Sequence, residues 1–168
     1  MRIVSFNING IRARLHQLAA VRERLDPDVL ALQETKVQDD EFPADAVRDL
    51  GYHAAWHGQK GHYGVAVLSK RPPVEVVRGL PGDGADAQRR LLTVRFDTAA
   101  GPVTVLDGYF PQGENRSHPV KFPAKRRFYA DVRDYLATRF APSDAIVLLG
   151  DMNVAPLDLD VGIGEENA

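Results

Sequence analysis

Short apolar runs and amphipathic stretches alternate along the chain. Residues 146–149 are four consecutive apolar residues, a pattern typical of a strand buried on both faces of a sheet. Two similar runs occur at residues 29–32 and within a strand predicted over residues 2–6. The pattern therefore predicts three buried strands, two near the beginning of the chain and one near its end.

Helical periodicity and turn residues account for most of the remaining chain. Apolar side chains form a helical stripe over residues 11–25, and a shorter helix is predicted over 39–50 because acidic residues open it and Gly51 follows it. A long amphipathic helix is predicted within 119–140, beginning near Phe122. Further strands, joined by turns rich in Gly and Pro, are predicted at 52–56, 64–69, 74–78, 91–96 and 103–106. This order predicts sheets covered by helices.

Polar side chains follow each of the three apolar runs. Asn7 follows the first run and Glu34 the second, while Asp151 and Asn153 follow the third. Mg²⁺ keeps several waters and needs only one or two carboxylates in addition to phosphate oxygens. Three apolar strands that deliver these side chains to one rim predict a single divalent-cation phosphoesterase site.

Each of these residues also has a structural interpretation. Glu34 could be a solvated residue at a strand end, and Asn7 could cap the helix that follows. In an extended chain Asp151 and Asn153 would point to one face, but the pair could instead close the strand with a side-chain turn. Gly150 permits close backbone approach, which favours the functional interpretation.

Other candidate residues are aromatic or basic. Tyr109 follows a strand and could donate its hydroxyl to a phosphate, or simply pack. Arg90 opens a strand, and Lys121 begins a basic helix start; both could contact phosphates or belong to solvated surfaces. The histidines at 53, 57 and 62 lack acidic residues at ligand spacing, which argues against a zinc site. The chain has no P-loop and no serine-elbow motif.

Composition narrows the possible partners and compartments. Among 168 residues the formal net charge is −2, so attraction to nucleic acid would have to come from a local basic patch. The absence of cysteine excludes disulfides and thiolate metal sites, and it fits a reducing compartment. We expect a cytoplasmic protein because the sequence has neither an export signal nor an apolar run long enough to span a membrane.

Six motifs in order resemble the exonuclease III family of abasic-site endonucleases. They are Ser-Phe-Asn-Ile-Asn-Gly-Ile-Arg-Ala at 5–13, Leu-Gln-Glu-Thr-Lys at 32–36, Gly-Gln-Lys-Gly-His-Tyr-Gly-Val-Ala at 58–66, Gly-Tyr-Phe-Pro-Gln-Gly-Glu at 108–114, Lys-Phe-Pro-Ala-Lys at 121–125 and Gly-Asp-Met-Asn at 150–153. The third and fourth motifs favour this family over its broader relatives, the DNase I-like nucleases and inositol-phosphate phosphatases.

The resemblance implies an α/β fold, a four-layer α/β/β/α sandwich that hydrolyses DNA phosphodiesters with Mg²⁺ or Mn²⁺. It implies incision on the 5′ side of abasic sites in duplex DNA, 3′→5′ exonuclease activity and trimming of 3′ ends in base-excision repair, by a protein monomeric at full length. By motif match, the implied residues are Glu34 and Asn7 at the metal, Tyr109 at the phosphate, Asp151 and Asn153 at the attacking water and scissile phosphate, and Arg90, Gln112 and Lys121 at the DNA.

The family pattern continues beyond the Gly-Asp-Met-Asn motif. A later Asp-containing motif and a closing Ser-Asp-His complete the family's site, and neither is present in residues 1–168. We therefore expect residues 1–168 to be the N-terminal part of a single domain, truncated after that strand, with little or no activity of its own. Two alternatives stay open at this stage: a metal-dependent phosphatase of small phosphate esters, and a non-catalytic remnant that binds DNA or a protein.

Overall fold

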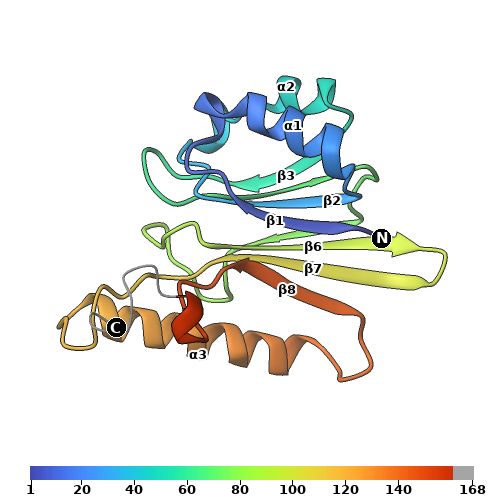
Figure 1. Cartoon of the computed structure of the whole chain (residues 1–168). Coiled ribbons are helices and arrows are strands. Elements are labelled where there is room, and N and C mark those ends of the chain that lie inside the picture. Colours follow the sequence, from blue (N-terminus) through green and yellow to red (C-terminus); the bar gives the residue numbers. More distant parts are fainter. Residues whose placement is uncertain (161–168) are drawn as a thin grey trace.

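The computed structural model describes residues 1–160, which form two four-stranded sheets packed face to face with helices on both outer sides (Figure 1). The first sheet has the strand order β1-β2-β4-β3, with bounds Ile3–Asn7 (β1), Val29–Gln33 (β2), Val65–Ser69 (β4) and His53–His57 (β3). The second sheet has the order β5-β6-β7-β8, with bounds Glu75–Arg78 (β5), Leu91–Thr98 (β6), Gly101–Tyr109 (β7) and Ile146–Asp151 (β8).

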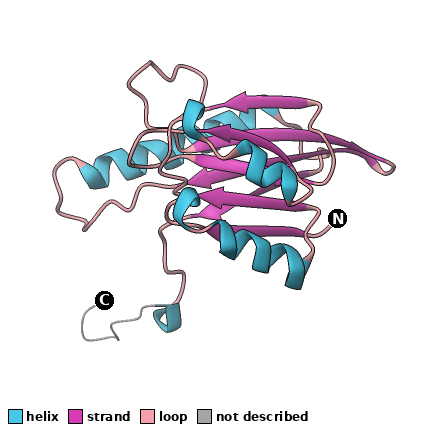
Figure 2. Ribbon diagram, turned by 90° about the horizontal axis from the view of Figure 1, so that it is seen from above, coloured by secondary structure: helices cyan, strands magenta, loops and turns pink. Residues whose placement is uncertain are grey.

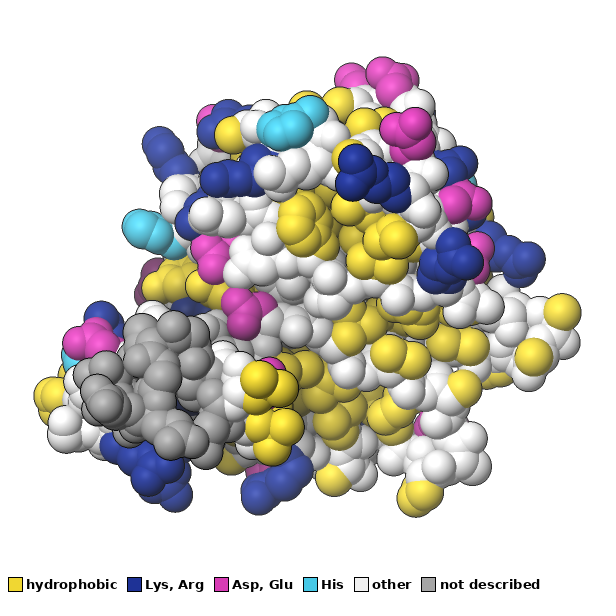
Figure 3. Space-filling model, in the orientation of Figure 1, with side chains coloured by type: hydrophobic (Ala, Val, Ile, Leu, Met, Phe, Trp, Pro, Cys, Tyr) yellow, Lys and Arg dark blue, Asp and Glu magenta, His cyan; other side chains and the backbone are white. Residues whose placement is uncertain are grey.

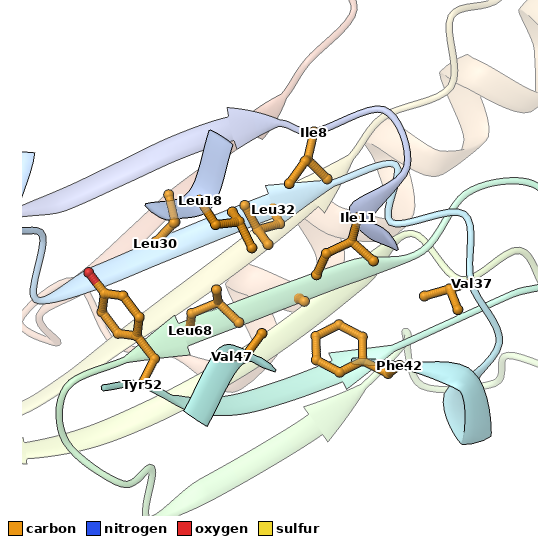
Figure 4. Close-up of a cluster of buried hydrophobic side chains, with 11 residues drawn as sticks. Ile8, Ile11, Leu18, Leu30, Leu32, Val37, Phe42, Val47, Tyr52 and Leu68 are labelled. Atoms are coloured by element: carbon orange, nitrogen blue, oxygen red, sulfur yellow. The ribbon is translucent and has the colours of Figure 1, made fainter. Parts of the chain in front are cut away.

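Helices α1 (Leu15–Leu25) and α2 (Ala44–Asp49) cover the outer face of the first sheet. Leu18 of α1 and Val47 of α2 are buried against apolar residues of β2 and β4 (Figure 4). Burial of such side chains contributes roughly 1.5–3 kcal/mol each. The amphipathic stripe in the sequence therefore forms the outer core of this sheet.

Helix α3 (Lys121–Arg139) covers the outer face of the second sheet. Val132 and Tyr135 pack on Leu91, Leu106 and Phe110. Between the sheets lies a third apolar cluster, which includes Val67 and Val105, so the layers alternate helix, sheet, sheet and helix. The α/β/β/α prediction is confirmed for residues 1–160. Viewed from above, the strands of the two sheets run in similar directions, with loops at both ends (Figure 2).

Two predicted helices differ from the structure in detail. The predicted helix over 11–25 is a 3₁₀ turn at Ile11–Ala13 followed by α1, because Arg14 leaves the helical conformation. The predicted helix over 39–50 is divided in the same way into Asp39–Glu41 and α2, with Pro43 between the two parts. A proline lacks the N–H that a continuous helix would need at this position.

The burial predicted for two of the three apolar strands is wrong. Every residue of β2 is buried, but β1 and β8 are only partly buried because each lies at the edge of its sheet. Figure 3 shows hydrophobic side chains exposed on the face where β1 and β8 lie. The predictions for the end of the tail, residues 161–168, lie outside the described residues. Within residues 1–160 no helix is long and apolar enough to cross a bilayer.

Candidate active site

Polar side chains from both sheets meet where strands β1, β2, β7 and β8 end. The Asn7 side-chain nitrogen Nδ2 donates to Glu34 Oε1 at 2.8 Å and to Asp151 Oδ2 at 2.9 Å. One amide of β1 therefore holds two carboxylates, one after β2 in its own sheet and one at the end of β8 in the other. The gathering of these three side chains, predicted from strand ends alone, is present in the structure.

Glu34 is surrounded by hydrogen-bond donors. Lys36 Nζ lies 2.8 Å from Glu34 Oε2, and Tyr109 forms a further hydrogen bond with the same carboxylate. Partial burial alone would raise the pKa of Glu34, but hydrogen bonds from Asn7, Lys36 and Tyr109 outweigh it and leave that pKa below its usual value. Glu34 is therefore an anion at neutral pH, with the oxygen chemistry that a hard cation requires.

Tyr109 is held between a carboxylate and a buried guanidinium. Burial and the hydrogen bond with Glu34 raise the pKa of Tyr109 to about 12, so its hydroxyl keeps its proton. The Arg90 guanidinium lies 4.8 Å from the Tyr109 ring centroid and 4.2 Å from that of Tyr63, and Arg90 Nη1 donates to the Tyr109 carbonyl at 2.9 Å. These contacts fix the ring and leave the hydroxyl able to donate to a phosphate oxygen.

Arg90 was predicted to contact DNA, but its side chain is largely occupied within the protein. Arg90 is 7% exposed, and its Nε donates to Gln88 Oε1 at 2.6 Å. Burial lowers the pKa of this guanidinium, and the neighbouring Tyr63 and Tyr109 partly offset the effect. The structure thus places Arg90 beneath the ring of Tyr109, in contact with the site residue itself.

We call the edge where strands β1, β2, β7 and β8 end the rim. Several residues of the rim have a left-handed backbone. Positive φ angles occur at Glu34 (55°), Lys36 (54°), Tyr63 (57°) and Asn153 (51°). Residues other than glycine pay roughly 1–2 kcal/mol for this conformation, and such strain concentrates at functional sites. The backbone is therefore strained at the residues whose side chains it orients at the site.

The β7–β8 pairing depends on two glycines that face each other, Gly108 and Gly150. A Cβ built on Gly150 would lie 2.0 Å from the Gly108 carbonyl oxygen, and the φ of Gly150 is 136°. The close backbone approach inferred from the sequence is therefore present. It sets the position of Asp151, the next residue.

Asp151 and Asn153 do not form the extended pair that their spacing suggested. Asp151 Oδ1 accepts from the Asn153 backbone N–H at 3.0 Å, which is the side-chain turn considered as the structural alternative. Asn153 Nδ2 then donates to the Phe110 carbonyl at 2.8 Å. The expected common face is wrong because the chain turns at Asn153, although Asp151 keeps Oδ2 directed at Asn7.

The remaining predicted DNA contacts lie on the loop before α3 and at its start. Gln112 is exposed, and its carbonyl accepts from Lys125 Nζ at 3.1 Å. Lys125 also donates to the Asn153 carbonyl at 2.6 Å, so it links this loop to the end of β8. Lys121 is exposed and forms an ion pair with Glu114. These residues flank the rim but do not touch Glu34 or Asp151.

Sequence reasoning missed two residues that stand directly behind the site. Gln33 and Asp107 are fully buried and hydrogen bonded to each other across the two sheets. The available signal was a polar residue directly after an apolar run, since Gln33 follows Leu32 and Asp107 follows Leu106. Lys36, the last residue of the Leu-Gln-Glu-Thr-Lys motif, is the cation in contact with Glu34.

The site's donor set fits a hard divalent cation. Within residues 1–160 no three His, Cys, Asp or Glu side chains form a metal-binding cluster. Glu34 and Asp151 nevertheless supply two carboxylates held by one amide, which suffices for Mg²⁺ or Mn²⁺ with waters and phosphate oxygens. Asn7, predicted at the metal, presents its amide nitrogen to the carboxylates while Oδ1 accepts from the Asn9 N–H at 3.1 Å. In this arrangement Asn7 is a donor that holds both carboxylates.

Residues 4–167 match the model of the endonuclease/exonuclease/phosphatase family. The chain belongs to this family. Within the family it is 54% identical over 167 residues to exodeoxyribonuclease III of Haemophilus influenzae, a match that covers 99% of this chain and 62% of the relative. It is 33% identical to the DNA repair nuclease APEX1 of Danio rerio, over 96% of this chain and 51% of that protein.

Solved structures of family members have the same architecture. An AP endonuclease from Archaeoglobus fulgidus superposes with a TM-score of 0.85 at 34% identity, over 96% of this chain and 60% of that one. A 3′-5′ exonuclease from Neisseria meningitidis gives 0.83 at 36% identity, over 94% and 60%. The chain thus spans about 60% of the length of these family members.

Proposed function

We propose that the chain carries the metal-binding and phosphate-binding part of a DNA phosphodiesterase of base-excision repair. The proposed activities are incision at abasic sites, 3′→5′ exonuclease action and trimming of 3′ ends of duplex DNA, with Mg²⁺ or Mn²⁺. The observation that carries the proposal is the Asn7 amide that joins Glu34 and Asp151 at one rim. We further propose that the full-length protein acts as a monomer in the cytoplasm.

The roles proposed for the residues follow from their protonation and contacts. Glu34 would hold the cation, with Asn7 and Lys36 fixing its carboxylate. Tyr109, which keeps its proton, would turn this single donor from Glu34 to a non-bridging phosphate oxygen. Asp151 would orient the attacking water or protonate the leaving group. When bound, the cation supplies Lewis-acid polarisation of the phosphoryl oxygen and stabilises the leaving 3′ oxygen.

DNA would approach along the flanking residues. Lys121 and Gln112 are exposed beside the rim and are the proposed backbone contacts, while Asn153 would donate to the scissile phosphate after releasing the Phe110 carbonyl. Arg90 would act on the phosphate through the ring of Tyr109, on which it stacks. Phosphate contacts of this kind position a duplex without reading its sequence.

The test is an incision assay on a chimera in which residues 2–160 replace the matching part of the H. influenzae relative. The chimera should nick an abasic-site duplex in Mg²⁺, and Glu34→Ala or Asp151→Ala should lower the rate by at least about 10³-fold. Asp45→Ala is the matched control, because this carboxylate is 88% exposed on α2. Wild-type rates in the Glu34 or Asp151 variant would remove the site assignment.

Two other outcomes would replace the proposed function. Release of inorganic phosphate from inositol phosphates without DNA nicking would indicate a small-ester phosphatase. Binding of abasic duplex without turnover, even in excess Mn²⁺, would indicate a non-catalytic DNA-binding protein. Both assays use the same chimera and the same Asp45→Ala control, so they separate these classes directly.

A further inference from the structure

A buried hydrogen bond crosses the interface between the two sheets one step behind the site. Gln33 Nε2 donates to Asp107 Oδ1 at 2.6 Å, and the two residues are 1% and 0% exposed. Gln33 is the last residue of β2, and Asp107 lies in β7. Polar groups so far from water cost free energy unless they are paired, so their use in an otherwise apolar interface calls for a physical reason.

Both partners are next to residues of the site. Gln33 directly precedes Glu34, and Asp107 lies two residues before Tyr109, so Asp107 and Tyr109 point to the same face of β7. Glu34 and Tyr109 are close enough to shift each other's pKa: the Tyr109 hydroxyl lowers that of Glu34, and the Glu34 carboxylate raises that of Tyr109. The two sheets are therefore joined by successive polar contacts, the inner one buried and the outer one at the rim.

The inner contact also reaches the strand that carries Asn7. Ser5 Oγ lies 3.4 Å from Gln33 Oε1, and Ser5 is two residues before Asn7 on the same face of β1. Ser5, Gln33 and Asp107 thus form a polar row across three strands. Asn7, Glu34 and Tyr109 form a second row along the ends of the same strands.

The charge state of Asp107 lowers the free-energy cost of burying its contact with Gln33. Burial raises the pKa of Asp107 well above its ordinary value, and the hydrogen bond from Gln33 offsets this only in part. Complete burial therefore favours the protonated form of Asp107, which avoids the much larger cost of a buried anion. Within residues 1–160 its second oxygen, Oδ2, accepts or donates no hydrogen bond.

We propose that Gln33 and Asp107 are positioning residues, whose hydrogen bond sets the relative position of β2 and β7 so that Tyr109 meets Glu34. The consequence for metal and phosphate rests on the proposed function, but the geometric claim does not. Apolar contacts alone would hold the sheets together with less directional constraint, because hydrophobic burial is non-directional. A hydrogen bond has a preferred length and angle, so it constrains how β2 and β7 are placed relative to each other.

The variants are chosen to separate positioning from plain structural support. Replacing both partners, Gln33→Leu with Asp107→Leu, removes the polar pair without leaving an unsatisfied group, so stability should be kept or raised. Asp107→Asn retains an oxygen that accepts from Gln33 and should preserve the geometry. Tyr135→Phe is the matched control, because it removes a buried hydrogen bond to Thr93, between α3 and β6.

The readout is the nuclear Overhauser cross-peak between the Tyr109 ring protons and the Glu34 methylene protons in the isotope-labelled chain. We expect the cross-peak in the wild type, in Asp107→Asn and in Tyr135→Phe, and its loss in the double leucine variant at unchanged thermal stability. If the double variant does not fold, Gln33→Met conserves volume and should show the same loss. An undiminished cross-peak in either apolar variant would overturn the inference.

A second measurement keeps this inference separate from the proposed function. Electron paramagnetic resonance of free Mn²⁺ gives the affinity of each variant, and the double leucine variant should bind about 10–100-fold more weakly than wild type. If the wild type binds no Mn²⁺, the proposed metal site is lost, while the cross-peak still decides whether Gln33 and Asp107 position Tyr109. Equal Mn²⁺ affinity of wild type and double variant would contradict positioning of the metal ligand.

Discussion

Protonation decides what each residue of the rim can do. Glu34 is ionised because three hydrogen bonds outweigh its partial burial, whereas Tyr109 stays protonated with a pKa of about 12. An anion able to bind a cation and a neutral donor able to bind phosphate are thus placed close together. Asp107 is the opposite case, a carboxyl kept neutral by complete burial. These states follow from burial and from each group's nearest partners.

Tyr109→Phe separates the hydroxyl from the ring. Phenylalanine keeps the face on which Arg90 stacks but cannot donate to a phosphate oxygen. We predict that incision by the chimera falls about 10²-fold, as for loss of one donor to developing charge. Because the pKa of Tyr109 is near 12, the wild-type rate should not fall from tyrosine ionisation below about pH 10. Undiminished incision by the Phe variant would refute the phosphate role.

Asp107→Asn should change the pH dependence of stability. The unfolded chain releases the Asp107 proton near pH 3.9, while the folded chain retains it, so wild-type stability falls as pH rises between those two pKa values. The loss is at most about 1.4 kcal/mol per pH unit. Asparagine cannot ionise, so its stability relative to wild type should increase from pH 4 to pH 7 in urea titrations. A difference that is constant with pH would contradict a neutral buried Asp107.

Strand pairing fixes where the site residues stand. Gly108 and Gly150 let β7 and β8 approach so closely that a side chain at either position would meet backbone or the ring of Phe110. Asp151 and Tyr109, the residues that follow, are brought side by side by this register. The pairing of Gly108 with Gly150 therefore fixes the position of the Asp151 carboxylate.

Gly150→Ala should destabilise the chain and displace Asp151. Its Cβ would lie 2.0 Å from the Gly108 oxygen, and overpacking of this kind costs about 1–3 kcal/mol or more. The matched control is Gly84→Ala, because a Cβ there meets nothing within 4 Å. Chemical denaturation compares the two variants. Equal midpoints would show that the β7–β8 approach does not need glycine at position 150.

Sequence periodicity was sufficient to predict the positions of most helices and strands. It was insufficient to predict which elements lie beside one another. Strand β2 was predicted near its observed position because its apolar run is continuous, and helix α3 was also predicted near its observed position. Burial of β1 and β8 was wrongly predicted, because an apolar run does not reveal whether a second strand pairs with it. The turn at Asn153 was considered only as the alternative, because the hydrogen bond from its side chain to the Phe110 carbonyl joins residues distant in sequence. Strand ends predicted the meeting of Asn7, Glu34 and Asp151, but not the buried pair behind them.

At the scale of the whole molecule, two sheets pack around one face-to-face core, and each sheet has two edge strands. Strands β1 and β8 are the edges on one side, and Ile146 of β8 is 36% exposed. Unpaired, partly apolar edges favour pairing with other chains. The same side carries the rim with Asn7 and Asp151, so the site lies where the fold offers its least protected strands.

We therefore predict that the chain self-associates as its concentration rises. Ile146→Lys should weaken the association, because a lysine on an edge strand opposes pairing between chains. Sedimentation velocity over a concentration series measures the change. Val74→Lys serves as a control, since this residue is 49% exposed and precedes β5 at the other side of the second sheet. Equal association of the Ile146 variant and wild type would exclude the β8 edge.

The measurement that tests the central claim most directly is paramagnetic relaxation by Mn²⁺ in the labelled chain. One equivalent of Mn²⁺ should broaden the amide signals around Asn7, Glu34, Tyr109 and Asp151 selectively, and Glu34→Ala should abolish the effect. Broadening that is confined to other acidic residues, or absent at saturating Mn²⁺, would show that the rim does not hold a divalent cation.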